Sequence, residues 1–247
     1  MVYLIVFRQL LISSVNGVFG LMSLTKRYKS TKKKKGGQPS NRKYELSTEQ
    51  KEALIGIILG DGYLERSKLT HNTRLAIDQA YPEKESYVNS LFELFRPMIS
   101  PDTENPNIFT MKPHKKTGKV YRSIRFRTLV HPCLNEYHDL FYKNKKKVVP
   151  ANLQELLTAR GLAYWIMDDG SKTMHGQTKI HTESFTKGEV EFLQTVLKAK
   201  FKLSTRIEQR DKDKRKDQWI IYIPVTQEVP LKDIVGPYMH QSMLYKI

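Results

Sequence analysis

The chain has 247 residues, with 42 lysine and arginine residues against 25 aspartate and glutamate residues, a formal net charge of +17 at pH 7. A positive excess of this size indicates a polyanionic partner, with nucleic acid as the first candidate. The single cysteine, Cys133, excludes a disulfide framework and a thiolate metal site. Neither the HExxH pattern of zinc proteases nor the GxxxxGK pattern of P-loop NTPases occurs.

The first 44 residues contain no aspartate or glutamate and combine an apolar segment with a basic one. The apolar segment, Met1 to Met22, is interrupted by Arg8, and the basic run includes Lys32 to Lys35. Two interpretations fit equally well: a mitochondrial presequence, or an unfolded arm that includes translated upstream sequence fused to the functional core. A membrane partner is not expected, because an uninterrupted apolar run of ~20 residues is missing.

Ordered structure is expected from Ser47, which forms an S-x-x-Q capping box with Gln50 and so begins a helix. That helix contains the apolar stretch LIGIILGDG, residues 54–62. Gly56 and Gly60 are four positions apart and leave a strip without side chains along the helix. A strip of this kind allows the backbone of a second helix to approach closely.

A similar stretch, LAYWIMDDG at residues 162–170, occurs in the second half of the chain. Both stretches predict an apolar helix whose last turn carries an aspartate, Asp61 or Asp169. Gly62 and Gly170 occupy the position at which a helix commonly ends on a left-handed glycine. A carboxylate at the negative end of the helix dipole is unfavourable, so each end is expected to have a compensating cation nearby.

The repetition favours a functional site over two ordinary helix ends. If the two apolar helices pack side by side, Asp61 and Asp169 come together. Two close carboxylates that both stay ionised favour a divalent metal, and an oxygen-only ligand set suits Mg²⁺. In the second stretch Tyr164 and Asp168 replace the two glycines and are interpreted as contacts between the helices. The two halves are therefore not interchangeable, and one chain is expected to supply both.

The remaining pattern predicts the same order of elements twice. The first half is expected to contain, after its motif helix, strands at 62–66 and 73–79, a helix at 83–98, strands at 108–111 and 120–129, and a helix at 132–142. The second half is expected to contain strands at 171–174 and 178–183, a helix at 187–201, strands at 203–210 and 218–223, and a helical segment at 231–245. A repeat of ~100 residues indicates a duplicated domain and not a solenoid.

Basic residues alternate along the predicted strands. In residues 120–129, Arg125 and Arg127 fall on one side and the apolar Ile124 and Phe126 on the other. Antiparallel sheets normally have one wet face, so alternation alone is ordinary, but the positive sign favours DNA phosphates and guanine edges as partners. The residues predicted to bind DNA are Arg74, Gln79, Arg122, Arg125, Arg127, Lys172, Lys179, His181, Arg206 and Arg210.

Both Asp-Gly stretches resemble the motif of the LAGLIDADG homing endonucleases, and LAYWIMDDGSK resembles the single-chain, two-motif members encoded in mitochondrial group I introns. The similarity runs from about Ser47 to the C-terminus. It implies an α+β fold of duplicated αββαββα halves with pseudo-twofold symmetry, whose two antiparallel four-stranded sheets form a DNA-binding saddle. On this basis residues 45–149 are the first half, residues 150–247 the second, and residues 1–44 a basic arm.

The resemblance also implies an activity: a monomeric, mitochondrial endonuclease that cuts both DNA strands at a long asymmetric site and so initiates intron homing. The expected cofactor is Mg²⁺, for which Mn²⁺ can substitute. The implied catalytic residues are Asp61, Asp169 and the basic residues Lys147 and Lys246. The neighbours Lys145 and Lys146 compete with Lys147 for this role, and the predicted metal site comprises Asp61, Asp169, Gly60 and Asp168.

Two alternatives stay open at this point. Some relatives are maturases that bind their group I intron RNA and aid its splicing, alone or in addition to cutting DNA. Paired carboxylates favour the nuclease, since a protein that only binds RNA has no need of two carboxylates in a groove for a polyanion. A generic basic DNA-binding protein ranks third, because it leaves the paired helix ends unexplained.

Overall fold

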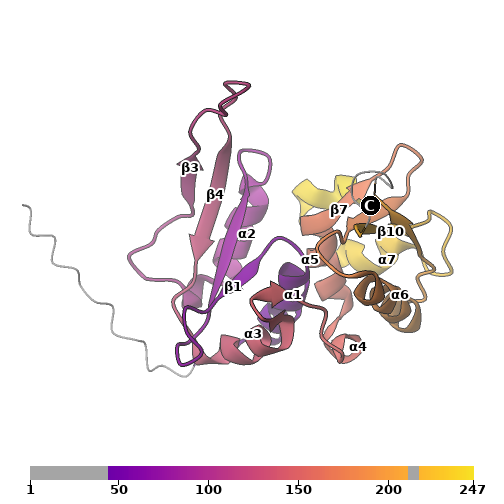
Figure 1. The fold of residues 1–247 in the computed structure, drawn as a ribbon, viewed down its shortest axis with the longest axis horizontal. Coiled ribbons are helices and arrows are strands. Elements are labelled where there is room, and N and C mark those ends of the chain that lie inside the picture. Colours follow the sequence, from indigo (N-terminus) through magenta and orange to yellow (C-terminus); the bar gives the residue numbers. More distant parts are fainter. Residues whose placement is uncertain (1–43, 211–216) are drawn as a thin grey trace, which may run out of the picture. The chain divides into compact units, whose positions relative to one another are not determined.

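A computed structural model describes residues 44–210 and 217–247 (Figure 1). The predicted N-terminal arm lies outside the described residues, except for Tyr44. None of the helices in the described ranges is both long enough and apolar enough to cross a bilayer.

The first half contains α1 (Thr48–Leu59), β1 (Tyr63–Glu65), β2 (Arg74–Ala80), α2 (Glu85–Leu94), the 3-10 turn η1 (Arg96–Met98), β3 (Asn107–Thr110), β4 (Arg122–Arg127), η2 (Pro132–Leu134) and α3 (Asn135–Phe141). A short hairpin, β5 (Tyr142–Lys143) and β6 (Lys146–Lys147), and α4 (Leu153–Leu156) follow. The second half contains α5 (Ala159–Asp169), β7 (Gly170–Lys172), β8 (Thr178–His181), α6 (Lys187–Phe201), β9 (Arg206–Gln209), β10 (Trp219–Ile223), α7 (Leu231–Val235), η3 (Gly236–Tyr238) and η4 (Gln241–Lys246). The predicted order of elements is thus confirmed, while the β5–β6 hairpin and α4 were not predicted.

The strands form two antiparallel four-stranded sheets, as predicted. Their orders are β1-β2-β4-β3 and β7-β8-β10-β9, so the second sheet repeats the connectivity of the first. Helix α2 packs against β2 and β4, and α6 packs against β9 and β10. Each sheet therefore has one face covered by its own helix, and we call the other face the open face.

Capping boxes begin the two helices for which the sequence supplies them. Ser47 Oγ accepts a hydrogen bond from the Gln50 amide at 3.2 Å, and the Gln50 side chain accepts one from the Ser47 amide at 3.0 Å. This confirms the predicted start of the first motif helix. Thr186 and Glu189 make the same reciprocal pair at the start of α6. Each box satisfies two helix N–H groups that have no partner within the helix.

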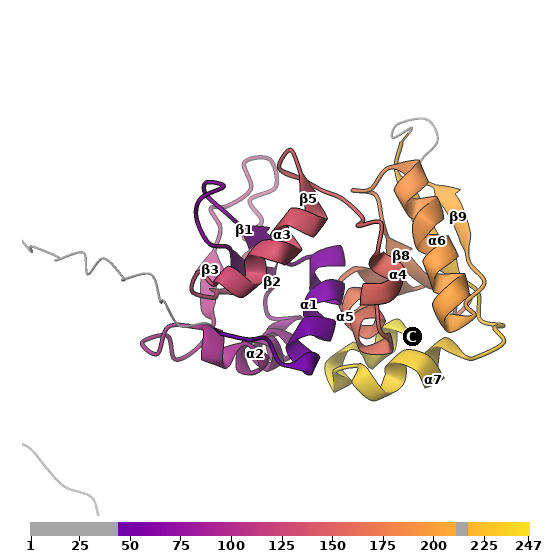
Figure 2. The same cartoon turned by 90° about the horizontal axis from the view of Figure 1, so that it is seen from below.

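Helices α1 and α5 lie side by side in both views (Figures 1 and 2). A Cβ atom added to Gly56 would lie 2.0 Å from the carbonyl oxygen of Gly161 and 2.8 Å from Cβ of Tyr164. A Cβ atom on Gly60 would lie 2.5 Å from Cβ of Asp168. The predicted close approach along the glycine strip is thus confirmed, and Tyr164 and Asp168 are the residues that face it.

The two motif glycines do not adopt the left-handed conformation that we predicted. Among the described residues, the glycines with positive φ are Gly118 and Gly176. Gly62 and Gly170 are instead required for space, because an added Cβ would lie 2.2 Å from Ile57 Cγ2 in the first case and 2.4 Å from the Ile166 carbonyl oxygen in the second.

The end of the first motif helix is also earlier than predicted. Helix α1 stops at Leu59 with Gly60 as its C-cap, so Asp61 lies just beyond the helix and not on its last turn. In the second half the prediction is correct, since Asp169 is the last residue of α5.

The close contact between helices predicts the effect of adding one methyl group. We expect Gly56→Ala to lower the free energy of unfolding by about 3 kcal/mol, because its Cβ meets backbone atoms that cannot move independently. Gly188→Ala in α6 is the matched control, since no atom lies within 4 Å of its added Cβ. It should raise stability by about 0.5–1 kcal/mol. Urea denaturation measures both, and equal midpoints for the two variants would contradict the packing described here.

Candidate active site and nucleic-acid interface

The ends of the two motif helices are joined directly by the Asp168 carboxylate. Its Oδ2 accepts a hydrogen bond from the Asp61 amide at 3.3 Å, and its Oδ1 accepts one from the Gln79 side-chain amide at 3.1 Å. Asp168 is 7% exposed. Its position opposite Gly60 leaves room for this bridge, so Asp168 ties the residue that follows the first helix to the second helix.

Three carboxylates, those of Asp61, Asp168 and Asp169, influence one another at this place. Burial, followed by the charge of Asp61, raises the pKa of Asp168 to about 7. The same two causes, in the same order, raise the pKa of Asp169 to about 8. Carboxylates whose pKa lies this high are held without enough positive charge nearby, which is the condition that a bound cation relieves.

A lysine from each half donates to the carbonyl groups at the end of its own motif. Lys147 Nζ donates to the carbonyl oxygens of Gly60 at 2.7 Å and Gly62 at 3.0 Å. Lys246 Nζ donates to those of Met167 at 2.6 Å and Asp168 at 3.1 Å. The cation that the sequence led us to expect at each helix end is therefore present, where it offsets the negative end of the dipole.

Lys147 is the member of its lysine run that reaches the motif. Asn144 and Lys145 form the β5–β6 turn with φ of 51° and 65°, and Lys146 is exposed in β6. Burial lowers the pKa of Lys147, while the carboxylate of Asp169 opposes this shift.

Lys84, which precedes α2, is a site residue that the sequence analysis missed. Its Nζ donates to the carbonyl oxygen of Met167 at 3.0 Å and lies 3.4 Å from that of Asp168. Burial, and after it the neighbouring Lys84 ammonium, lowers the pKa of Lys246 to about 8. Among the residues that the structure describes, two lysines thus reach the second motif end and one reaches the first. No local pattern distinguishes Lys84 from other lysines, because its contact depends on how α2 packs beside α5.

The donor set fits Mg²⁺ better than a metal that needs a protein cage. Within residues 44–210 and 217–247, no three histidine, cysteine, aspartate or glutamate side chains converge as a metal site. Mg²⁺ is typically held by one or two carboxylates together with substrate phosphates and water. Asp61 and Asp169 supply two such carboxylates. The carbonyls of Gly60 and Asp168 already accept lysine hydrogen bonds. Their predicted part in a metal site stays a prediction.

Most of the predicted DNA-binding residues lie on the open faces. Strand pairing places Glu65 opposite Arg74, and Asp78 opposite Arg125. The Arg125 guanidinium lies 4.0 Å from the centre of the Phe109 ring. The predicted residues on the two open faces are Arg74, Arg125, Arg127, Lys179, His181 and Arg206. Arg210 follows β9 and contacts Glu183.

Three predicted DNA-binding residues lie elsewhere. Gln79 is 7% exposed and is directed toward Asp168. Lys172 is paired with the buried Thr178, and its Nζ donates to the carbonyl oxygen of Ile247 at 2.8 Å. Arg122 lies on the same face of β4 as the buried Ile124, and its guanidinium carbon lies 4.5 Å from the centre of the Tyr81 ring. Side chains alternate along a strand, so the register decides the face, and the sequence alone did not give the register.

Comparison with known proteins agrees with this architecture. The probable intron-encoded endonuclease 1 of Wickerhamomyces canadensis is 33% identical over 210 residues, which cover 82% of this chain and 85% of that protein. The cytochrome b mRNA maturase bI2 of Debaryomyces hansenii is 32% identical over 202 residues, which cover 82% of this chain and 74% of that protein. The solved structure of the homing endonuclease I-WcaI bound to its DNA recognition sequence matches with a TM-score of 0.73 and 30% identity, over 85% of this chain and 94% of that one.

Residues 51–229 match the family described as the LAGLIDADG DNA endonuclease family. This range includes α5, both four-stranded sheets and all of α1 except its first three residues. The chain therefore belongs to the LAGLIDADG DNA endonuclease family.

Proposed function

We propose that this protein is a monomeric, Mg²⁺-dependent homing endonuclease that cuts both strands of a long asymmetric DNA site. The pairing of Asp61 and Asp169 at adjacent helix ends is the observation that carries this proposal. A protein of net charge +17 gains nothing for DNA binding from carboxylates, since they repel phosphates. Their presence is explained if they hold a cation at the scissile phosphates.

In this proposal the open faces, the two aspartates and the two lysines have separate roles. The basic side chains of the open faces bind and orient the duplex. Asp61 and Asp169 hold Mg²⁺, which when bound neutralises phosphate charge and makes water a better nucleophile. Lys147 and Lys246 lie against the same helix ends and stabilise the negative charge that develops on the phosphate during hydrolysis.

The names of the relatives support both the activity and the compartment. The W. canadensis relative is named as a probable intron-encoded endonuclease, and the matching structure contains a homing endonuclease with its DNA. The maturase relatives are named for cytochrome b, a protein of mitochondrial genes. We therefore propose a mitochondrial protein whose target is the uninterrupted allele of its host gene.

A maturase activity is the second candidate, and the similarity to cytochrome b mRNA maturases is the observation that favours it. The partner would be the group I intron RNA. The basic surfaces are compatible with either activity, because they bind RNA phosphates as well as DNA phosphates.

The carboxylate pair gives the first test of the nuclease. We expect Asp61→Asn and Asp169→Asn to bind a DNA fragment that spans the uninterrupted exon junction, but to leave both strands uncut in Mg²⁺. Each substitution removes the negative charge that holds the cation and keeps the side-chain volume. Withholding Mg²⁺ from the wild-type protein should have the same effect, with Mn²⁺ restoring cleavage. Gel electrophoresis of the fragment measures cleavage, and mobility shift measures binding.

Asp233→Asn is the matched control, because it makes the same charge change at an exposed site on α7. It should cut like the wild type. Full double-strand cleavage by Asp61→Asn or Asp169→Asn would remove these residues from the proposed metal site.

The lysine run offers a test with an adjacent control. We expect Lys147→Met to slow cleavage by roughly 100-fold, because it removes the ammonium that lies against the first motif end. Lys146→Met should cut at nearly the wild-type rate, since its side chain is exposed on the other side of β6. Single-turnover cleavage rates, with binding measured in parallel, distinguish the two. Equal rates for both variants would make Lys147 a packing residue only.

The RNA alternative is tested with the same proteins. If the chain is a nuclease alone, a filter-binding assay should show no preference for the intron RNA over an unrelated structured RNA of equal length. Specific retention of the intron RNA without any DNA cleavage would move the protein to the maturase class. Retention together with cleavage would identify a bifunctional protein.

A further inference from the structure

One carboxylate on the open face of the first sheet lies between two arginines. Glu65 Oε2 accepts a hydrogen bond from Arg74 Nε at 2.5 Å, and its Oε1 accepts one from Arg127 Nε at 3.3 Å. The three residues come from β1, β2 and β4, which are consecutive in the sheet. Glu65 is 27% exposed and each arginine side chain is 42% exposed.

Both contacts use the same part of the guanidinium group. Because Glu65 accepts from Nε in each case, its carboxylate leaves the Nη1 and Nη2 atoms of Arg74 and Arg127 outside these two hydrogen bonds. These terminal nitrogens form the fork that binds O6 and N7 of guanine in the major groove. Arg127 has a further side-chain hydrogen bond with Tyr63. In the second sheet Arg206 also donates Nε to Glu208, at 2.8 Å, and its Nη1 donates to Gln177.

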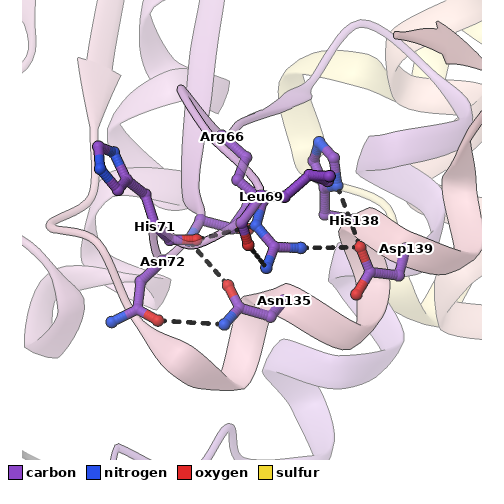
Figure 3. Close-up of polar contacts among 8 residues, drawn as sticks. Arg66, Leu69, His71, Asn72, Asn135, His138 and Asp139 are labelled. Atoms are coloured by element: carbon purple, nitrogen blue, oxygen red, sulfur yellow. Dashed lines mark hydrogen bonds and ion pairs between the residues drawn. The ribbon is translucent and has the colours of Figure 1, made fainter. Parts of the chain in front are cut away.

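The loop between β1 and β2 is fixed at the residue after Glu65. Figure 3 shows Arg66 donating to the carbonyl oxygens of Leu69 and His71 and to the carboxylate of Asp139 in α3. The distances to His71 and Asp139 are both 2.8 Å. The β1 end of the loop is therefore held by an internal ladder of hydrogen bonds and by a helix of the core.

The other end of the loop is fixed at the residue before Arg74. Asn135 of α3 accepts a hydrogen bond from the Thr73 amide at 2.9 Å and donates one to Asn72 at 3.1 Å (Figure 3). The backbone positions of Glu65 and Arg74 are thus set by neighbours bound to one helix. Such support reduces the conformational freedom that the arginine forks lose on binding.

Charge excludes a role for Glu65 in affinity. Although burial opposes it, the guanidinium groups of Arg74 and Arg127 lower the pKa of Glu65, so the carboxylate is ionised at neutral pH. An ionised carboxylate on a DNA-binding face repels phosphates and reduces non-specific binding. What it provides in return is orientation, because a side chain held through Nε has its fork direction fixed.

We propose that Glu65 is a specificity-determining positioning residue, which holds the forks of Arg74 and Arg127 ready for two guanines of the target. The inference rests on the proposed function, because it assumes that the open face of the first sheet contacts duplex DNA. Within the described residues, Glu65 is the carboxylate that accepts Nε hydrogen bonds from two different arginines.

The test is selection of binding sites from a randomised duplex pool by the full-length protein. The wild type should enrich guanine at two nearby positions. Glu65→Gln should lose that preference by roughly fivefold or more at each position, keep its preferences elsewhere, and bind unrelated duplex as tightly as the wild type or more tightly. Glu93→Gln is the control, since it makes the same charge change at an exposed site on α2 and should leave the profile unchanged.

A second variant separates arginine readout from a direct contact of Glu65 with cytosine. Arg74→Lys keeps the charge but removes the fork, so it should lose one of the two positions that Glu65→Gln loses. If it loses neither, Glu65 acts alone and the inference is wrong. A wild-type profile for Glu65→Gln, or a uniform loss at every position, also overturns the inference.

Cleavage of the selected sequence by the wild type keeps this test separate from the nuclease proposal. Selection of the two guanines without any cleavage would refute the nuclease and leave the role of Glu65 intact. Cleavage of a selected site that has no such guanines would refute the role of Glu65 and leave the nuclease proposal intact.

Discussion

The backbone of α1 lies against the backbone of α5, and the rest of the site depends on that contact. Gly56 makes it possible, because any side chain there would occupy the place of the Gly161 carbonyl. The two helices therefore end together and bring their terminal carboxylates to one place. Protein interiors are densely packed, so side-chain adjustments would not fill the gap if α1 and α5 lay further apart. The packing of these two helices therefore sets the spacing of Asp61 and Asp169.

Bringing two helix ends together gathers negative charge, and the neighbouring lysines follow from it. The negative ends of the α1 and α5 dipoles lie close together, and the carboxylates of Asp61, Asp168 and Asp169 lie beside them. Buried charge requires pairing, which Lys84, Lys147 and Lys246 supply through carbonyl groups and not through carboxylates. Burial and the charge of Asp61 leave Asp168 and Asp169 with raised pKa values. The site thus keeps affinity for a further cation even though the chain as a whole is strongly basic.

The sequence predicts what depends on short patterns and misses what depends on register and packing. The motif helices, their aspartates and the Ser47 cap are local features, so they were found. Lys84 and Glu65 acquire their partners from other elements, and no neighbouring residue marks them. Gln79 illustrates the limit most clearly: its polar side chain was assigned to the open face, but strand pairing directs it inward to Asp168. The predicted left-handed conformation of Gly62 was also wrong; glycine is needed there for space, since an added Cβ would meet Ile57.

The unequal residues at the two helix ends make the two halves of this chain non-interchangeable. Gly60 and Asp168 hold matching positions, and the Asp168 side chain fills the space that Gly60 leaves. Two glycines would leave the Asp61 amide without its acceptor, and two aspartates would bring Cβ atoms to within 2.5 Å of a neighbour. A symmetric pair built from either of these residues would lose one feature of this contact. A single chain with two different halves avoids both, and it gains two chemically distinct motif ends, of which only the second receives Lys84. Such a difference suits a target whose two strands are not equivalent.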